Sequence, residues 1–417
     1  MAEGWEGTVM TMAFGMLTTL LYLMSANALL NANLTAPKKH YKVGAYYNGG
    51  YKDRTLMYAR FRSTFDTYLT NTVGPMFSNN ITFTLVAMNE TVMITAIQNK
   101  TIDFVLADPA AISCFQTEFE IAPLSTLRSF RTGTGLKKNG GTVFIKSTNA
   151  GIPEARNFSG KIVALETLAT SSGGQLQWEA LELEGVHLLT DAKQLRFVQD
   201  DESIVDAVAF GTADIGFIGG GALESMGDTG RINISDFTVI HRINNTYEDA
   251  EFPFTVSTQL VPYWGLAMLK DTDWHVAEYI TDGLYSLDAD SVYARDGNYS
   301  FWQPPLSYSH IRDVHEKLGY LHEIPSTDHY QCMRATNIYE QLVCPSGFVK
   351  RTPDEINATC STYIESESRF ICPSGFECFC TPCRAASVVE LTHQGVYDHS
   401  PFPAPITYRM HRVNPIL

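Results

Sequence analysis

The chain has 417 residues and a net charge of −15, with 45% hydrophobic and 18% charged residues. This composition is globular and long enough for two or three domains, which excludes wholesale disorder. The acidic balance and the lack of any basic run argue against a nucleic-acid-binding protein. One long uncharged apolar stretch occurs, at the N-terminus, so a multi-spanning membrane protein is not expected.

The N-terminal segment, residues 1–36, is predicted to be a signal peptide or a signal anchor. No residue between Gly7 and Pro37 is charged, and Ala26-Asn27-Ala28 has the small-x-small form of a cleavage site. Glu3 and Glu6 stand where a signal peptide usually carries basic residues. A buried core helix is the alternative interpretation.

Strand-like and helix-like patterns alternate over residues 37–325, as in an α/β domain. The predicted strands are Tyr41–Tyr47, Ile81–Met88, Ile102–Ala107, Lys161–Leu165, Leu195–Val198 and Ala213–Ile218. The predicted helices are residues 54–73, Glu90–Gln98, Gly174–Leu183 and Glu202–Phe210. Residues 170–174 are expected to form a loop.

An internal repeat indicates two lobes of similar construction. Residues 96–104 match residues 207–215 without a gap. Both copies have Ala and an apolar residue, then three variable residues, and then Thr, an apolar residue, Asp and an apolar residue. In both copies a helix leads through a turn that carries Asp into a short strand, and a loop of small residues follows. Because ligands of open α/β sheets bind beyond the carboxyl ends of strands, two such lobes predict a cleft between them.

Four motifs in residues 41–287 resemble the phosphate- and phosphonate-binding proteins of bacterial ABC importers. The motifs are residues 99–108, residues 158–164, the Thr170-Ser171-Ser172-Gly173 loop, and residues 200–205 followed by 211–216. The resemblance implies a two-lobed type II periplasmic-binding-protein fold with a hinge and an interlobe cleft. We expect lobe one at about 37–125 and 255–325, and lobe two at about 126–254, with crossovers near 123–143 and 240–262.

The loop at residues 170–173 is the leading candidate for an anion site. Three hydroxyls precede a predicted helix whose free N–H groups and dipole favour an anion, although plain helix capping would use the same residues. The resemblance implies that this loop holds phosphonate oxygens. The candidate ligand-binding residues are Tyr46, Tyr47, Asp108, Thr170, Ser171, Ser172, Gly173, Asp201 and Gly220.

Several of these candidates have a structural alternative. Tyr46 and Tyr47 either wall the cleft or pack in the core, and Asp108 either contacts ligand or caps a turn. Asp201 either meets a ligand amine or caps the next helix, which is the favoured interpretation. Where the family often has a donor histidine, this chain has Gln199, Asp200 and Asp201, so the family's ligands do not transfer directly.

Basic residues near the first crossover are expected to form a solvated hinge surface. They are Arg128, Arg131, Lys137 and Lys138. The overall charge of −15 does not favour attraction of an anion from a distance. His310 and His315, on a later helical segment, are expected to face solvent rather than bind metal.

Seven of the eight cysteines lie between residues 332 and 383, and they predict a small disulfide-rich module at 326–384. The repeated Cys-Pro-Ser-Gly-Phe at 344 and 372 resembles extracellular EGF- or ephrin-receptor-like repeats. Because seven cysteines cannot all pair, Cys114 either bridges to this module or is a buried free thiol. Zinc at Cys378, Cys380 and Cys383 is an alternative. The predicted disulfide cysteines are Cys114, Cys332, Cys344, Cys360, Cys372, Cys378, Cys380 and Cys383.

Nine N-x-S/T sequons predict glycosylation and hence an extracellular, eukaryotic secretory location. They are Asn33, Asn80, Asn89, Asn99, Asn157, Asn233, Asn244, Asn298 and Asn357. The tail, residues 385–417, shows no periodicity.

The sequence therefore predicts an extracellular protein that binds a small anionic solute, without catalysis, cofactor, metal or nucleic acid. It would serve as a receptor or sensor ectodomain, or as a transport-associated binding protein, with a membrane anchor or a downstream receptor module as a further expectation. Two alternatives remain: an adhesion or matrix protein with a vestigial cleft, and an enzyme related to thiamine-pyrimidine synthases. The catalytic motifs sought, such as a nucleophile elbow or a P-loop, do not occur.

Overall fold

A computed structural model describes residues 34–47, 51–149, 158–198, 200–248, 250–324 and 329–333. It also describes four short strands: β19 (Phe348–Lys350), β20 (Cys380–Pro382), β21 (Leu391–Thr392) and β22 (Arg409–Met410). Nearly all of the predicted signal segment, of the cysteine-rich module and of the tail lies outside these residues, so those predictions stay predictions.

The first lobe is built on a mixed sheet with strand order β16-β4-β15-β3-β1-β2, and β5 pairs with β4. Strands β1, β2 and β3 run parallel, whereas β15, β4 and β16 pair antiparallel. The strands are β1 His40–Tyr46, β2 Thr82–Met88, β3 Phe104–Ala107, β4 Ala122–Arg131, β5 Thr134–Leu136, β15 Gly265–Met268 and β16 Tyr299–Gln303.

Helices cover this sheet, and several begin at side chains that accept a hydrogen bond from the first helical turn, as in N-caps generally. Asn89 caps α4, Asp108 caps α5, Asp273 caps α10 and Ser291 caps α11. The helices are α2 Tyr51–Arg62, α3 Leu69–Thr72, α4 Glu90–Gln98, α5 Pro109–Phe119, α10 Trp274–Tyr285, α11 Val292–Gly297 and α12 Ser309–Lys317. A π-helical segment, Ser63–Tyr68, and a 3₁₀ turn, Gly74–Met76, extend α2 and α3.

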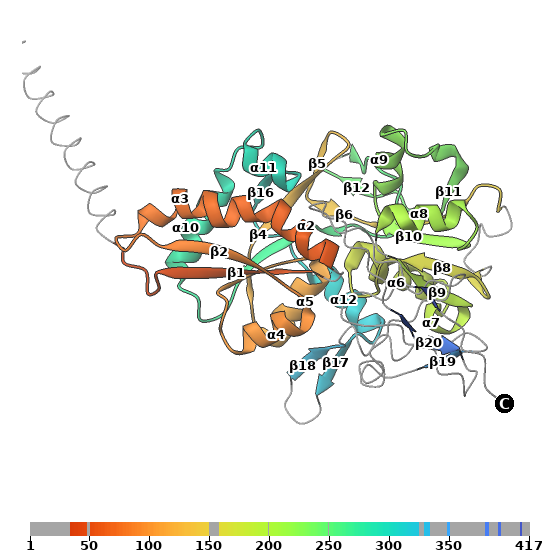
Figure 1. Ribbon diagram of the computed structural model, residues 1–417, viewed down its shortest axis with the longest axis horizontal. Helices are drawn as coiled ribbons and strands as arrows, with labels where there is room; N and C mark the ends of the chain where they lie inside the picture. The colour runs from red at the N-terminus through yellow and green to blue at the C-terminus, as the bar shows by residue number, and fades with distance from the viewer. Residues whose placement is uncertain are drawn as a thin grey trace, which may run out of the picture.

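The second lobe has a five-stranded sheet with order β11-β7-β10-β8-β9. Its strands are β7 Gly141–Lys146, β8 Ile162–Leu165, β9 Gln194–Phe197, β10 Ile215–Gly219 and β11 Phe237–Ile240. Its helices are α6 Leu176–Leu183, α7 Leu188–Asp191, α8 Asp201–Ala209 and α9 Ala222–Asp228, with a 3₁₀ turn at Ile234–Asp236. Figure 1 shows the two lobes side by side, so the predicted two-lobed α/β architecture is confirmed.

The chain crosses between the lobes in two segments that pair with each other. Strand β6 (Lys138–Asn139) on the outgoing segment pairs with β14 (Val261–Pro262) on the returning segment. Next to this pair, the Gly141 N–H donates to Thr258 Oγ1 at 2.7 Å. A short hairpin of β12 (Thr246–Tyr247) and β13 (Ala250–Glu251) precedes the return. The hinge is therefore a small hydrogen-bonded unit.

The internal repeat seen in the sequence folds the same way in both lobes. In lobe one the Asp103 N–H donates to Lys42 O and the Asp103 carboxylate accepts from Lys42 N, both at 2.9 Å. In lobe two Asp214 makes the same pair of bonds with Ile162, at 2.9 Å and 2.8 Å. Each aspartate thereby ties the turn after a helix to a strand of its sheet, β1 in lobe one and β8 in lobe two.

A C-terminal arm follows the two lobes and lies beneath their junction (Figure 1). It consists of α12 and an antiparallel hairpin of β17 (Leu321–Ile324) and β18 (His329–Cys332). Tyr320, Leu321 and Cys332 are buried in the same apolar cluster as the strands of the second sheet. Helix α12 also packs on α5 of lobe one.

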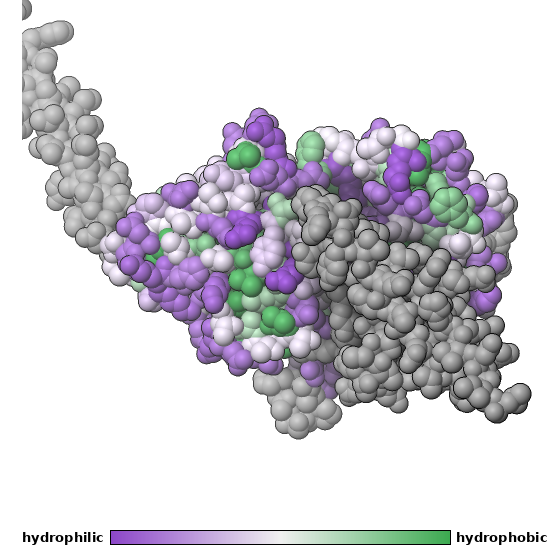
Figure 2. All heavy atoms as spheres, viewed as in Figure 1, coloured by the Kyte–Doolittle hydropathy of each residue, from purple (hydrophilic) through white to green (hydrophobic). Residues whose placement is uncertain are grey.

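Each lobe has its own apolar core, on both faces of its sheet. On the face drawn in Figure 2, hydrophobic side chains of lobe one form small groups within a largely hydrophilic surface. Isolated apolar groups of this kind are ordinary for soluble domains. That face therefore gives no reason to place a function away from the lobe junction.

Candidate functional site

The predicted anion-binding loop is not a loop, because a π-helical turn begins at Ser171 and runs to Gln175 before α6 starts. The Ser171 N–H and hydroxyl both donate to Asp108 Oδ2, at 3.0 Å and 3.2 Å. Asp108 Oδ1 accepts from Ala111 N at the start of α5. A carboxylate of lobe one therefore already uses two donors of the lobe-two turn.

Asp108 and Ser171 are both buried, with exposed fractions of 4% and 3%. Burial raises the pKa of Asp108, while the N–H groups of Ser171 and Ala111 hold it down. Asp108 therefore caps α5, which was the structural alternative for this residue, and it also joins the two lobes. That Asp108 contacts a ligand stays a prediction.

The other hydroxyls of the turn are not committed to Asp108. Thr170 Oγ1 is buried without a hydrogen-bond partner among the described residues. If Gly173 carried a Cβ, that atom would lie 2.9 Å from Thr170 Oγ1. Ser172 Oγ lies 3.6 Å from the position of a Cβ at Gly219. The Ser172 hydroxyl therefore faces the glycine loop that follows β10.

Asn139, from the hinge strand β6, meets the same glycine loop. If Gly219 carried a Cβ, that atom would lie 3.5 Å from Asn139 Nδ2. A Cβ on Gly220 would lie 2.7 Å from Asn139 Oδ1. Asn139 Oδ1 is buried with no hydrogen-bond partner within the described ranges. Glycine at these two positions keeps the space between Asn139 and the loop free of side chains.

Arg131, at the end of β4, reaches the same loop from lobe one. Its Nη1 donates to Gly220 O at 2.8 Å. The backbone of Gly219 hydrogen-bonds the Asp201 carboxylate, and burial raises the pKa of Asp201 while the Arg131 charge opposes that rise. Asp200, not Asp201, caps α8, because its side chain accepts from Ser203 N. The favoured interpretation of Asp201 as the helix cap is therefore wrong.

Arg60 on α2 adds a second guanidinium. Its Nε donates to Gly297 O at 3.1 Å, and its Cζ lies 5.0 Å from the Phe61 ring centre. Burial lowers the pKa of Arg60, and the charge of Arg131 lowers it further. Tyr263, whose charge state also acts on Arg60, has a buried hydroxyl with no partner in the described part of the chain.

In the part of the chain that the structure describes, neither Arg60 nor Arg131 forms an ion pair within 4.0 Å, although the charge of Arg131 acts on the Asp201 carboxylate. We call the resulting group the interlobe site: Arg131, Asn139, Ser172 and Asp201 lie around Gly219–Gly220, and Arg60 is included because the charge of Arg131 acts on it. Its two guanidinium groups outnumber its single carboxylate. The site can therefore hold an anion and present one acidic group to it.

The other basic residues of the hinge behave differently. Arg128 and Lys137 both pair with Glu248, and Arg128 also donates to Tyr247. Lys138 lies half-buried in β6. These contacts stabilise the hinge, and among the four basic hinge residues Arg131 is the one that contacts the glycine loop.

The two candidate tyrosines lie near the end of β1. Tyr46 is buried in the core of lobe one, edge-on to Phe115. Tyr47 is half-buried, and its backbone N–H donates to Met88 O. The contacts of Tyr46 match its core-packing alternative, and whether either ring meets a ligand stays a prediction.

Sequence reasoning missed Arg60 and misjudged His315. Arg60 lies in a helix rich in charged residues, where nothing in the local pattern distinguishes it. His315 is 1% exposed rather than solvent-facing, and burial lowers its pKa to about 3. His310 is half-buried. The apolar spacing of Ile311 and Val314 on α12 and of Leu318, just after the helix, was the signal that His315 would point inward.

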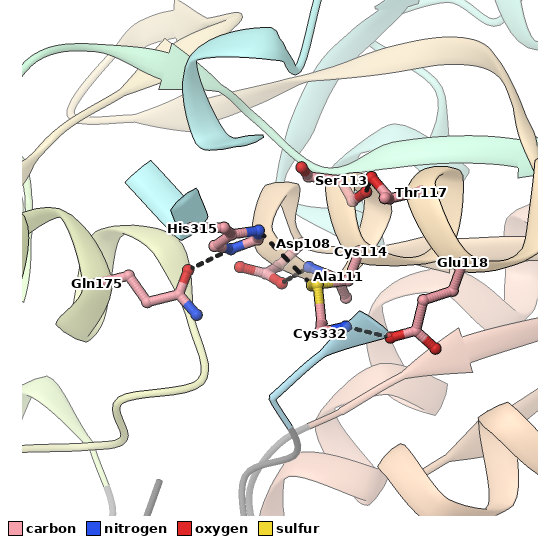
Figure 3. Close-up of a disulfide and its surroundings, with 9 residues drawn as sticks. All are labelled: Asp108, Ala111, Ser113, Cys114, Thr117, Glu118, Gln175, His315 and Cys332. Carbon is pink, nitrogen blue, oxygen red and sulfur yellow. Dashed lines mark hydrogen bonds between the residues drawn. A yellow bond between two sulfur atoms is a disulfide. The ribbon is translucent and has the colours of Figure 1, made fainter. Parts of the chain in front are cut away.

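Cys114 forms a disulfide with Cys332, as one of its two alternatives predicted. Figure 3 shows the disulfide between α5 and β18, with His315 beside it. His315 Nδ1 lies 3.6 Å from Cys114 Sγ, and His315 Nε2 hydrogen-bonds Gln175 Oε1 at 2.9 Å. The ligand atoms of Cys114, His315 and Cys332 lie within 4.8 Å of one another, but the disulfide uses both sulfur atoms. The other six cysteines have no described side chain.

Six predicted glycosylation sites fall on described residues. Asn89 is half-buried and caps α4. The exposed sequon residues are Asn80, Asn99, Asn233, Asn244 and Asn298. Exposure is compatible with a glycan, and glycosylation stays a prediction. Among the described residues, no helix is long and apolar enough to span a membrane.

Comparison with known proteins agrees with this architecture. A stretch covering 53% of this chain is 25% identical to the tetrathionate sensor histidine kinase TtrS of Salmonella typhimurium over 226 residues. The chain spans about a third of that relative's length, since it covers 36% of it. XAC2383 from Xanthomonas citri, solved with ATP, is 15% identical, covers 68% of this chain and 98% of its own, and has a TM-score of 0.51. The chloride-bound form of XAC2383 has a TM-score of 0.50 at 16% identity, over 67% of this chain and 100% of its own.

One family model matches residues 57–305, more than half of the chain, and it includes both lobes and the hinge. Its description is the periplasmic substrate-binding protein of phosphonate ABC transporters. The appended EGF- or ephrin-receptor-like module is outside this match. The chain belongs to the phosphonate-type periplasmic substrate-binding protein family.

Proposed function

We propose that this protein binds a small oxyanion at the interlobe site. The observation that carries the proposal is the pair of guanidinium groups, Arg60 and Arg131, that form no ion pair within 4.0 Å among the described residues and donate to backbone oxygens instead. Guanidinium forks match phosphonate, phosphate and sulfonate oxygens in geometry and charge. The family description names phosphonate, and the curated relative is a tetrathionate sensor, so both point to the same ligand chemistry.

The hydroxyl of Ser172 and the amide of Asn139 supply neutral donors beside the arginines. Because Ser171 is committed to Asp108, we place the anion on the Ser172 side of the turn, toward Gly219 and Gly220. Asp201 would then accept a hydrogen bond from a protonated ligand oxygen or from a ligand amine. This placement narrows the expectation that Thr170, Ser171 and Ser172 all contact the anion to Ser172.

We propose further that binding is read out by another module. The matching part of the curated relative belongs to a sensor kinase, and the chain spans about a third of that protein. The sequons and the predicted N-terminal signal segment support an extracytoplasmic location. Mass spectrometry of the secreted protein before and after deglycosylation tests the location through the glycans at Asn80 and Asn298.

A thermal-shift screen tests the binding function. The panel contains phosphate, methylphosphonate, 2-aminoethylphosphonate, sulfate and tetrathionate. A ligand present at a hundred times its Kd stabilises the folded state by about 2.7 kcal/mol, and the Arg131→Met variant should lose this stabilisation. Arg231→Met is the matched control, because Arg231 pairs with Glu202 and Asp206 on the surface. An equal shift in all three proteins would contradict binding at the interlobe site, and no shift in any would favour an adhesion role.

A further inference from the structure

A row of buried polar side chains on lobe two faces the C-terminal arm and α5. Ser171, Gln175 and Glu179 are spaced four residues apart, so they share one face of the turn and α6. Their exposed fractions are 3%, 0% and 5%. A polar stripe this buried has to be satisfied from outside its own helix.

Each member of this stripe has its partner on the other side of the junction. Ser171 donates to Asp108 on α5, Gln175 Oε1 accepts from His315, and Glu179 accepts from Lys317 Nζ at 2.7 Å. His315 and Lys317 lie on α12. These three contacts join one face of lobe two to lobe one and to the arm.

An apolar layer lies under the three contacts. Ala110 on α5, Leu176 on α6, and Ile311 and Val314 on α12 form one buried cluster with Val261 of the hinge. The arm therefore packs on both lobes at once. Separating the lobes along this edge would expose the cluster as well as break the polar contacts.

The disulfide ties the end of the arm to lobe one. Cys332 closes β18 and bonds to Cys114 in α5, while the Cys332 N–H donates to Glu118 at 2.7 Å (Figure 3). Tyr320 and Leu321, between α12 and β18, pack in the core cluster of lobe two. A segment seated on lobe two is thus covalently anchored to lobe one.

We propose that the arm is a clasp that holds the lobes together at this edge and controls how fast ligand enters and leaves the interlobe site. The clasp consists of the Ser171–Asp108, Gln175–His315 and Glu179–Lys317 contacts and the Cys114–Cys332 disulfide. Its effect on ligand exchange rests on the proposed function, whereas its effect on lobe separation does not. Opening a two-lobed binding protein is a hinge motion, and this clasp opposes that motion.

Hydrogen exchange of the ligand-free protein tests the clasp without any ligand. The Ser171 N–H is a direct reporter, because it donates to Asp108 across the junction. In the Cys114→Ala/Cys332→Ala variant, exchange in the 170–179 peptide should rise by about tenfold or more. Exchange in α8, in the same lobe but outside the clasp, should stay at the wild-type rate.

A second variant keeps the disulfide and guards against simple misfolding. Gln175→Met preserves the length of the side chain and removes the acceptor of His315, so it should raise exchange in 170–179 by a smaller factor. Lys270→Met is the control, because Lys270 and Glu120 form an exposed pair on lobe one. Unchanged exchange in 170–179 in the disulfide variant, or an equal rise in α8, would overturn the clasp.

The second part of the experiment measures ligand exchange with methylphosphonate as the probe. Stopped-flow rates of association and dissociation should both rise in the disulfide variant, because each requires the lobes to separate. Faster amide exchange without any methylphosphonate binding in the wild type would uphold the clasp on the lobes and contradict the proposed function. Faster amide exchange with unchanged ligand rates would show that the clasp does not control access.

Discussion

The Asp108 carboxylate of lobe one accepts two hydrogen bonds from Ser171 of lobe two, one from its N–H and one from its hydroxyl. The anion that meets the start of the π-helical turn is therefore a side chain of the protein itself. This contact fixes the relative position of α5 and α6 and leaves the Ser172 side of the turn for a ligand.

Removing Asp108 should free the Ser171 donors for an external anion. Asp108→Ala removes the acceptor of three buried donors, the N–H and hydroxyl of Ser171 and the N–H of Ala111, so it should lower the free energy of unfolding by at least about 1–3 kcal/mol. Phosphate should restore part of this loss by occupying the vacated space. Asp108→Asn is the matched control, since its amide oxygen still fills that space, and phosphate should restore little there. Denaturant unfolding with and without phosphate measures both, and equal restoration in the two variants would contradict this account.

Bulk at Gly220 should block the interlobe site while leaving the lobes folded. A Cβ there lies 2.6 Å from Val256 Cγ1 and 2.7 Å from Asn139 Oδ1, so Gly220→Val forces side chains into the space beside Arg131. Affinity for methylphosphonate should fall by about tenfold or more, because even small displacements of charged contacts cost about 1.4 kcal/mol. Gly227→Val is a suitable comparison, since Gly227, like Gly220, has no positive φ, and a Cβ there meets only the Ile234 side chain, at 3.6 Å and beyond. An unchanged affinity in Gly220→Val would place the ligand elsewhere.

Gly174 should tolerate substitution much less than Gly173. A Cβ at Gly174 lies 2.1 Å from the backbone oxygen of Thr167, whereas a Cβ at Gly173 first meets the side-chain oxygen of Thr170 at 2.9 Å. A backbone atom cannot move aside as a side chain can, so Gly174→Ala should lower the free energy of unfolding by about 2 kcal/mol or more. Gly173→Ala should cost less, and thermal denaturation of both variants checks the order.

Acid should weaken the protein through His315. Burial lowers its folded pKa to about 3, below the ordinary value of 6.5, so the unfolded state binds more protons between these two values. The contribution of neutral His315 to the free energy of unfolding is therefore fully present above pH 6.5. It falls as the pH drops toward 3, by up to about 1.4 kcal/mol per pH unit.

The His315→Gln variant tests the acid effect directly. Glutamine can still donate to Gln175 but does not titrate, so the slope of stability against pH between 6.5 and 4 should flatten. Asp108 has the opposite effect, because a raised pKa means that the folded state binds its proton more readily than the unfolded state, so acid stabilises the fold through this residue. Asp108 is present in both proteins, so the difference between their slopes reports on His315. Denaturant unfolding across this pH range gives both slopes, and identical slopes would exclude His315 as the cause.

The parts of the fold that the sequence predicted well are the helix–turn–strand units marked by the internal repeat. Asp103 and Asp214 stood in a nine-residue repeat, and each makes the same two backbone bonds in its own lobe. The partners of the two aspartates are 61 and 52 residues away, but the same helix–turn–strand sequence precedes each bond, so a repeat can reveal both. The strands that follow the two aspartates were predicted for the same reason.

The site was harder to predict because its members come from distant segments. The charge of Arg131 acts on Arg60 although one residue lies in β4 and the other in α2, far apart in the chain. His315 and Gln175 are 140 residues apart, and His315 was expected in solvent. Long-range pairings of this kind depend on how the lobes and the arm pack, which neither spacing nor composition encodes.

The measurement that tests the central claim most directly is an isothermal titration of methylphosphonate into the wild type and into the Arg60→Gln/Arg131→Gln variant. The account predicts one binding site per wild-type chain and an affinity at least about a hundredfold lower in the variant, since two charge-assisted contacts are lost. Equal affinity in the two proteins would contradict an oxyanion site built on Arg60 and Arg131.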